Sequence, residues 1–171
     1  NTDVFIAVLN HGLDSLFYCS YLGGDGMDKA LTIRAFQDST FYISLSATDT
    51  LPLASSSYIA SFADDIFEGN SEAGIARFSS FNQLDFGTYI GGSSDDLINA
   101  FQVLSDSDIV FAGNTRNITE INGSIPDNGT GQEALFGRIN VPSSGPVSFD
   151  ILDKIGGSGS DYAWGIFSMG D

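Results

Sequence analysis

The feature that most constrains this chain is a short pattern that occurs three times, as "YLGGDGMD", "YIGGSSDD" and "KIGGSGSD". Each copy has two adjacent glycines and an aspartate five positions after the first glycine. The residues concerned are Gly23, Gly24 and Asp28, then Gly91, Gly92 and Asp96, then Gly156, Gly157 and Asp161. A local pattern that returns at a long, nearly constant spacing indicates a repeat architecture, in which each repeat supplies one structural unit.

Strand-like runs keep the same order around each copy of the pattern. The runs "DVFIAVLN", "AGIARFSS" and "EALFGRIN" precede the turns, a second run leads into the glycines, and further runs such as "ALTIRAF" and "FYISLSAT" follow. Alternating apolar and polar residues rich in aromatic and β-branched types favour strands. Four short antiparallel strands per period form the blade unit of a β-propeller. The sequence therefore predicts an all-β chain of about three repeats, at approximately 3–72, 73–132 and 133–171, which together form an incomplete propeller segment.

The diglycine turns have an expected structural role. Glycine accepts positive φ without steric cost, which suits a sharp turn between one blade and the next. The aspartate that follows can accept hydrogen bonds from backbone amides of the turn. We therefore expect the glycines and aspartates to be structural rather than catalytic.

A family resemblance is visible in "DVFIAVLN…LFYCSYLGGDGMDKALTI" and "GIARFSS…LDFGTYIGGSSDDLINAF". These segments resemble the bacterial β-propeller repeat known as the SBBP repeat, and the resemblance covers nearly all of the chain. The chain departs from the family pattern at two positions. Lys154 stands in place of tyrosine in the third copy, and Val8 stands in place of the usual basic residue in the first copy, whereas Arg77 and Arg138 keep that residue in the other two. The resemblance implies that the strand after each diglycine is innermost. We then expect about eleven strands, the last of them an orphan strand near Ile166. Such an incomplete propeller is either a fragment of a longer propeller or a subunit that other copies complete.

The charge and composition restrict the possible partners. The formal net charge is −16, from 22 acidic and 6 basic residues. Such a surface repels phosphate backbones, so nucleic acid is not an expected partner. No apolar run approaches the roughly 20 residues that span a bilayer. Cys19 is the single cysteine, which rules out an intrachain disulfide. Acidic charge, the absence of cytosolic motifs and the family resemblance together predict an extracellular or cell-surface protein.

Two long connections are the expected recognition elements. They span residues 49–72 and 116–132, and both join a second strand to a third, which places them on one face. Long loops often carry binding residues. The residues proposed for contact with protein or glycan are Tyr58, Phe62, Phe67, Arg116 and Asn122. The aromatic residues among them could instead pack on the blade, and three glycosylation sequons lie within the second connection.

Calcium is the one cofactor that the sequence suggests. Carboxylates, hydroxyls and flexible carbonyls gather near the turns, as oxygen-preferring ions require, although no EF-hand loop is present. The candidate ligands are Asp25, Asp28, Asp95 and Asp96. The single histidine, His11, offers no triad. We therefore expect a non-enzymatic scaffold for protein or glycan recognition. The alternatives are a carbohydrate-active enzyme that uses clustered carboxylates, and a structural subunit that self-assembles through open blade edges.

Overall fold

The computed structural model describes residues 2–37, 39–51, 67, 69–80, 83–116, 118, 131–142 and 147–169. Within these ranges the fold is all-β, with ten strands and no helix, and therefore no helix long and apolar enough to cross a bilayer. The strands are β1 Val4–Leu9, β2 Leu16–Leu22, β3 Lys29–Phe36, β4 Thr40–Ala47, β5 Glu72–Ser80, β6 Gln83–Ile90, β7 Leu97–Val103, β8 Asp108–Thr115, β9 Glu133–Asn140 and β10 Ser148–Ile155.

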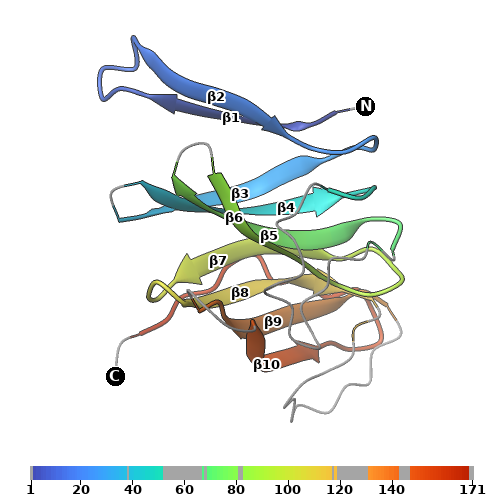
Figure 1. Cartoon of the computed structure of the whole chain (residues 1–171). Helices are drawn as coiled ribbons and strands as arrows, with labels where there is room; N and C mark the ends of the chain where they lie inside the picture. The colour runs from blue at the N-terminus through green and yellow to red at the C-terminus, as the bar shows by residue number, and fades with distance from the viewer. Residues whose placement is uncertain are drawn as a thin grey trace.

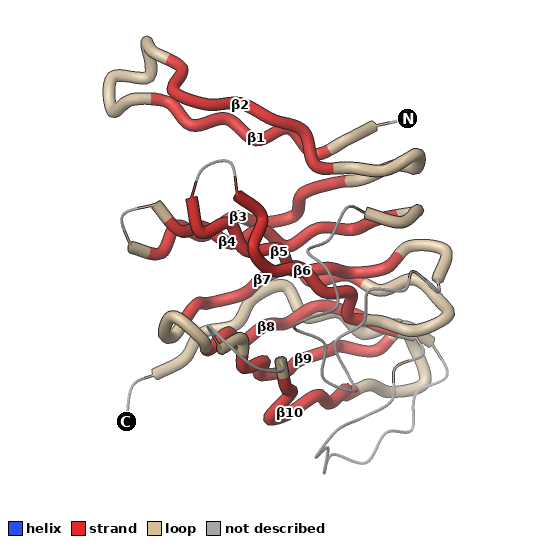
Figure 2. The backbone as a smooth tube through the Cα atoms, in the orientation of Figure 1, coloured by secondary structure: helices blue, strands red, loops and turns tan. Residues whose placement is uncertain are grey.

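The strands form three antiparallel sheets that are stacked along the chain (Figure 1). Strands β1 and β2 form an N-terminal hairpin. Strands β3 to β6 form a middle sheet in chain order, and β7 to β10 form a C-terminal sheet in the same order. The expectation of four-stranded antiparallel units is confirmed for the two larger sheets. Each four-stranded sheet takes its first two strands from one sequence repeat and its last two from the next, so the first two diglycine turns connect neighbouring sheets (Figure 2).

Strand β4 shows why these sequences are so apolar. Its side chains alternate between the two faces of the middle sheet, as the pleat requires. Phe41, Ile43 and Leu45 pack toward the N-terminal hairpin, whereas Tyr42 belongs to the core shared with the C-terminal sheet. Because both faces are covered, nearly every side chain of β4 is buried.

Two hydrophobic cores hold the stack together. The larger core lies between the middle and C-terminal sheets and includes Ile75, Phe101 and Phe111. The smaller core lies between the N-terminal hairpin and the middle sheet, where the hairpin contributes only Val4, Ile6 and Leu22. The hairpin is therefore much less covered than the sheets, and five of its large apolar side chains are more than half exposed. These are Phe5, Leu13, Leu16, Phe17 and Tyr21.

The expected orphan strand near Ile166 is not formed, and this part of the prediction is wrong. Residues 156–169 carry no strand assignment. Beyond the third turn, which Asp161 ties to the Gln132 carbonyl, the segment makes only scattered contacts among the described residues. The Ala163 amide donates to the Gly113 carbonyl at 3.1 Å, Asn99 Nδ2 donates to the Ala163 carbonyl at 2.9 Å, and the Ser168 amide donates to Gln102 Oε1 at 2.8 Å. A strand needs a continuous backbone ladder with a neighbour, and these contacts do not provide one.

One charged residue crosses between the two large sheets. Arg77 of β5 forms an ion pair with Asp85 at 3.2 Å and lies over the Phe86 ring. Its guanidinium also donates to two carbonyls of the C-terminal sheet, those of Asp106 and Val141, at 3.4 and 3.3 Å. The side chain is only 10% exposed. Arg77 is therefore a buried charged link in an interface that also holds hydrogen bonds from the Tyr42 hydroxyl to the Asp106 carbonyl and from the Ser44 hydroxyl to the Ile98 carbonyl.

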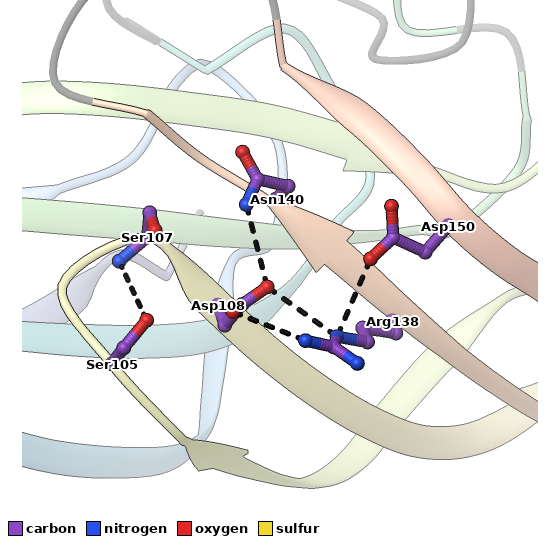
Figure 3. A network of polar contacts seen from close by, with 6 residues as sticks. All are labelled: Ser105, Ser107, Asp108, Arg138, Asn140 and Asp150. Atoms are coloured by element: carbon purple, nitrogen blue, oxygen red, sulfur yellow. Dashed lines mark hydrogen bonds and ion pairs between the residues drawn. The ribbon is translucent and has the colours of Figure 1, made fainter.

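The equivalent arginine of the next repeat lies at the surface (Figure 3). Arg138 pairs with Asp108 at 3.1 Å and with Asp150 at 3.4 Å, and its side chain is 45% exposed. The Arg138 guanidinium holds the pKa of the Asp108 carboxyl below its usual value. The sequence pattern thus places arginine at the same repeat position twice, with different surroundings.

Candidate functional site: the turn face

The three diglycine turns share one hydrogen-bonding arrangement. In each, Oδ2 of the repeat aspartate accepts a hydrogen bond from the amide of the second glycine. The pairs are Gly24 to Asp28 at 2.8 Å, Gly92 to Asp96 at 2.9 Å and Gly157 to Asp161 at 2.8 Å. This is the contact that the constant spacing predicts for a carboxylate that pins a turn. The geometry explains why the aspartate stands five positions after the first glycine in every copy.

A second contact repeats with equal regularity. The backbone amide of each repeat aspartate donates to a carbonyl just before a strand, namely β1, β5 or β9. The donor and acceptor pairs are Asp28 to Thr2 at 2.7 Å, Asp96 to Ser71 at 2.8 Å and Asp161 to Gln132 at 2.7 Å. Each aspartate therefore ties its turn both to the preceding glycine and to the start of a strand.

Three further acids, which the sequence analysis did not single out, complete the arrangement. Asp3, Glu72 and Glu133 directly follow the three acceptor carbonyls. A Cβ atom added to the first glycine of each turn would approach both this acid and the repeat aspartate. At Gly23 it would lie 2.7 Å from Asp3 and 2.8 Å from Asp28. The first glycine is therefore enclosed by two acidic side chains in all three copies.

The expected reason for the glycines is wrong in one respect. Gly23, Gly24, Gly91, Gly156 and Gly157 do not adopt the left-handed φ that the sequence analysis assumed. Gly23, Gly24, Gly91 and Gly156 are needed instead because of close approach, whereas an added Cβ at Gly157 would meet only Asp161 Oδ2, at 3.9 Å. At Gly91 an added Cβ would lie 2.6 Å from Asp96 Oδ2, and at Gly24 it would overlap the Thr50 carbonyl oxygen.

The two most buried repeat aspartates differ in how their second oxygen is bonded. Burial raises the pKa of both Asp28 and Asp96. Asp96 Oδ1 accepts a hydrogen bond from the Thr115 hydroxyl, whereas Asp28 Oδ1 is buried and has no hydrogen-bond partner. The residue of β4 equivalent to Thr115 is Ala47, because Lys29 pairs with Ser46 as Leu97 pairs with Asn114. The first turn thus lacks the hydroxyl that the second turn has.

We expect the Ala47→Thr variant to raise the free energy of unfolding at pH 7 by about 1 kcal/mol, since a buried carboxylate oxygen gains a donor. The folded-state pKa of Asp28 is raised, so in the parent chain stability falls as pH rises through that pKa. The hydroxyl of the variant stabilises the ionised carboxylate of Asp28. The gain in the free energy of unfolding is therefore present at pH values above the folded-state pKa of Asp28, and it shrinks when the pH falls below the ordinary value of 3.8. Urea unfolding at pH 7 and at pH 3.5 measures this.

The Ala47→Val variant is the matched control for this prediction. Valine has almost the same shape as threonine but cannot donate a hydrogen bond. If valine stabilises the chain as much as threonine at pH 7, the effect is cavity filling and the hydrogen-bond account of Asp28 is wrong.

The residue before each Ile/Leu-Gly-Gly sequence also has different polar partners in different copies. Tyr89 directly precedes Ile90 in the second copy, and its hydroxyl accepts a hydrogen bond from the Leu51 amide beside the first turn at 2.6 Å. Burial raises the pKa of Tyr89 to about 12. Lys154 occupies this position in the third copy and forms a 2.7 Å ion pair with Glu133. Lys154 therefore neutralises one of the two acids beside the third turn.

The described ends of both long connections lie beside these turns. Close contacts join Gly24 to Thr50, Gly69 to Ser94, and Gly131 to Gly159. The turns and the connection ends thus meet on one side of the stack, at the right in Figure 1, and we call this side the turn face. A hollow of about 410 Å³ lies at its first turn, and the residues that line it are Gly23, Gly24, Asp25, Asp49, Thr50 and Leu51.

The predicted binding residues fall into two groups. Tyr58, Phe62 and Asn122 lie outside the described residues. Phe67 is partly buried and meets the Tyr89 ring edge-on at 6.0 Å, so it packs against the smaller core. Arg116 is exposed at the end of β8.

The predicted calcium ligands are not brought into one cluster. Asp28 and Asp96 belong to different turns and each engages its own glycine amide. The Asp25 amide donates to Asp49 Oδ2 at 3.0 Å, and Asp95 is exposed. Among the described residues, no group of three or more histidine, cysteine or acidic side chains is arranged to hold a metal ion. Calcium binding stays a prediction.

Comparison with known proteins gives no assignment: no family model matches the chain, and no curated protein matches it either.

Proposed function

We propose that this chain is a non-enzymatic β-propeller-type scaffold of the SBBP-repeat kind, which presents the turn face for recognition of protein or glycan outside the cell. The observation that carries the proposal is the threefold recurrence of one pinned turn. In the two buried aspartates of these turns, Asp28 and Asp96, Oδ2 accepts a hydrogen bond from a backbone amide. That use of carboxylates serves rigidity rather than acid–base chemistry.

The connection ends support the choice of the turn face as the binding surface. The described ends of both long connections contact the diglycine turns. The pinned turns therefore form a rigid support for these ends. Binding residues are commonly carried by loops on a rigid scaffold. Asp25 and Asp49 line the hollow at the first turn and give it acidic character, which favours a partner with hydroxyl groups or positive charge.

A glycan array and a panel of basic peptides, probed with the labelled chain, test this function. We expect binding without turnover, and an Asp25→Asn/Asp49→Asn double variant should weaken it at least about 10-fold. The Asp14→Asn variant changes an acid in the β1–β2 turn, at the other end of the hairpin, and should leave binding unchanged. Conversion of a bound sugar to product, or equal losses in both variants, would contradict the proposal.

A further inference from the structure

We propose that the open edge of β1, together with the groove between β1 and the strands β3 and β4, is an acceptor site for a two-stranded β-hairpin of the kind that β3 and β4 themselves form. The proposal concerns the side of the hairpin that faces the middle sheet. It is independent of what the turn face binds.

The pairing pattern identifies the edge. Within each four-stranded sheet the third strand is paired on both sides: β5 with β4 and β6, and β9 with β8 and β10. Strand β1 occupies the same repeat position, since Val4 pairs with Leu22 as Ala73 pairs with Ile90. Among the described strands, β1 pairs only with β2. Its other edge therefore presents backbone donors and acceptors that are able to pair with an added strand.

The exposure of equivalent side chains shows what is uncovered. Ile33 of β3 and Phe101 of β7 hold the same position in successive sheets, because the registers β3–β4 and β7–β8 match. Phe101 is 2% exposed, since β7 packs against β3 and β4 of the preceding sheet. Ile33 is 55% exposed. We therefore expect a hairpin placed on β3 and β4 to bury the exposed side chain of Ile33, as the neighbouring sheet buries Phe101.

The groove has the chemistry of a strand acceptor. Its volume is about 290 Å³, and the residues that line it are Ile6, Ala7, Val8, Leu9, Ile33, Ala35, Gln37, Ser39, Thr40 and Phe41. None of these carries a charge, although the chain as a whole is strongly acidic. An uncharged groove beside an open strand edge suits β-augmentation, in which backbone pairing supplies affinity and pockets receive alternate side chains.

The chain itself shows the required shape of the occupant. Strands β7 and β8 turn Ile98, Phe101, Ile109 and Phe111 toward the middle sheet, and this is the face equivalent to Ile33 of the acceptor. The occupant would lie on the other side of the middle sheet, so its contact face corresponds to the one that β3 and β4, the hairpin equivalent to β7 and β8, turn toward the C-terminal sheet. That face carries Phe36 and Tyr42. The occupant should therefore be an antiparallel hairpin with aromatic side chains at these two positions. It should pair its second strand with β1 and lay its first strand over Ile33.

A fluorescein-labelled peptide of residues 29–47, which contains β3 and β4, is the probe. We expect saturable 1:1 binding to the full chain with a dissociation constant of about 1–100 µM, because the hairpin must fold as it binds. Fluorescence anisotropy measures the affinity. Amide hydrogen exchange should show new protection of β1 residues when the peptide is bound.

Variants on both walls of the groove locate the binding. Ile33→Lys and Leu9→Lys place charges at exposed positions of the two walls and should each weaken binding at least about 10-fold without unfolding the chain. Phe17→Lys makes the same kind of change at an exposed β2 position outside the groove and should leave the affinity within about 2-fold.

Three results would overturn the proposal. The first is no saturable binding, or equal binding of a scrambled peptide. The second is equal loss of affinity in the Phe17→Lys control. The third is a stable dimer by sedimentation that protects β1 and excludes the peptide, since the occupant would then be a second copy rather than an inner hairpin.

Discussion

Replacement of Arg77 with alanine is expected to lower the free energy of unfolding by about 2–4 kcal/mol, one of the largest single-residue effects in the chain. The substitution removes the ion pair with Asp85 and leaves that carboxylate partly buried without its cation. It also removes the donor to the Asp106 and Val141 carbonyls, which ties the middle sheet to the C-terminal sheet. Chemical denaturation monitored by circular dichroism measures the loss.

Arg138 supplies the matched control for this prediction. It holds the equivalent repeat position, but its side chain is 45% exposed against 10% for Arg77, and its partners are the half-exposed Asp150 and the partly buried Asp108 (Figure 3). Surface ion pairs contribute little, so Arg138→Ala should cost at most about 1 kcal/mol. Similar losses in the two variants would show that Arg77 does not form the buried link described above.

Replacement of Gly91 with alanine is expected to cost about 2–4 kcal/mol, comparable to the loss of Arg77. The added methyl would lie 2.6 Å from Asp96 Oδ2. Asp96 cannot move aside freely, because one oxygen is held by the Gly92 amide and the other by the Thr115 hydroxyl in a fully buried position. The variant must therefore break the pinned turn or displace the backbone. Thermal and urea unfolding measure the change.

Gly157→Ala is the control within the same motif. It changes the second glycine of the third turn, where the nearest atom to an added Cβ is Asp161 Oδ2 at 3.9 Å. We expect an effect within about 0.5 kcal/mol. If Gly157→Ala were as costly as Gly91→Ala, glycine would be required for backbone conformation rather than for the closeness of the two acids.

Much of the sheet structure follows from sequence because it depends on local patterns. Alternation of apolar and polar residues locates the strands, and the turn signals between them set the four-stranded units. The strand expected near Ile166 failed because strand formation needs a partner, which a local pattern cannot report. The same limit applies to β1, whose sequence resembles β5 although its surroundings differ.

The candidate site was only half visible in the sequence. The repeat aspartates stand out because their spacing from the glycines is constant. Their partners Asp3, Glu72 and Glu133 lie at strand starts, and alignment of the three acids at these positions could have found them. Nothing local distinguishes Arg77 from Arg138, since burial is decided by which sheet lies opposite. The contrast between Ala47 and Thr115 likewise becomes meaningful only once their shared position in the sheet is known.

One carboxylate-pinned diglycine turn occurs three times in this chain with the same hydrogen bond. NMR scalar couplings across hydrogen bonds, measured in a uniformly labelled sample between each second-glycine nitrogen and the aspartate side-chain carbon, test this directly. We expect a measurable coupling in all three pairs: Gly24 with Asp28, Gly92 with Asp96, and Gly157 with Asp161. Absence of the coupling in any pair whose amide is otherwise protected from exchange would contradict it.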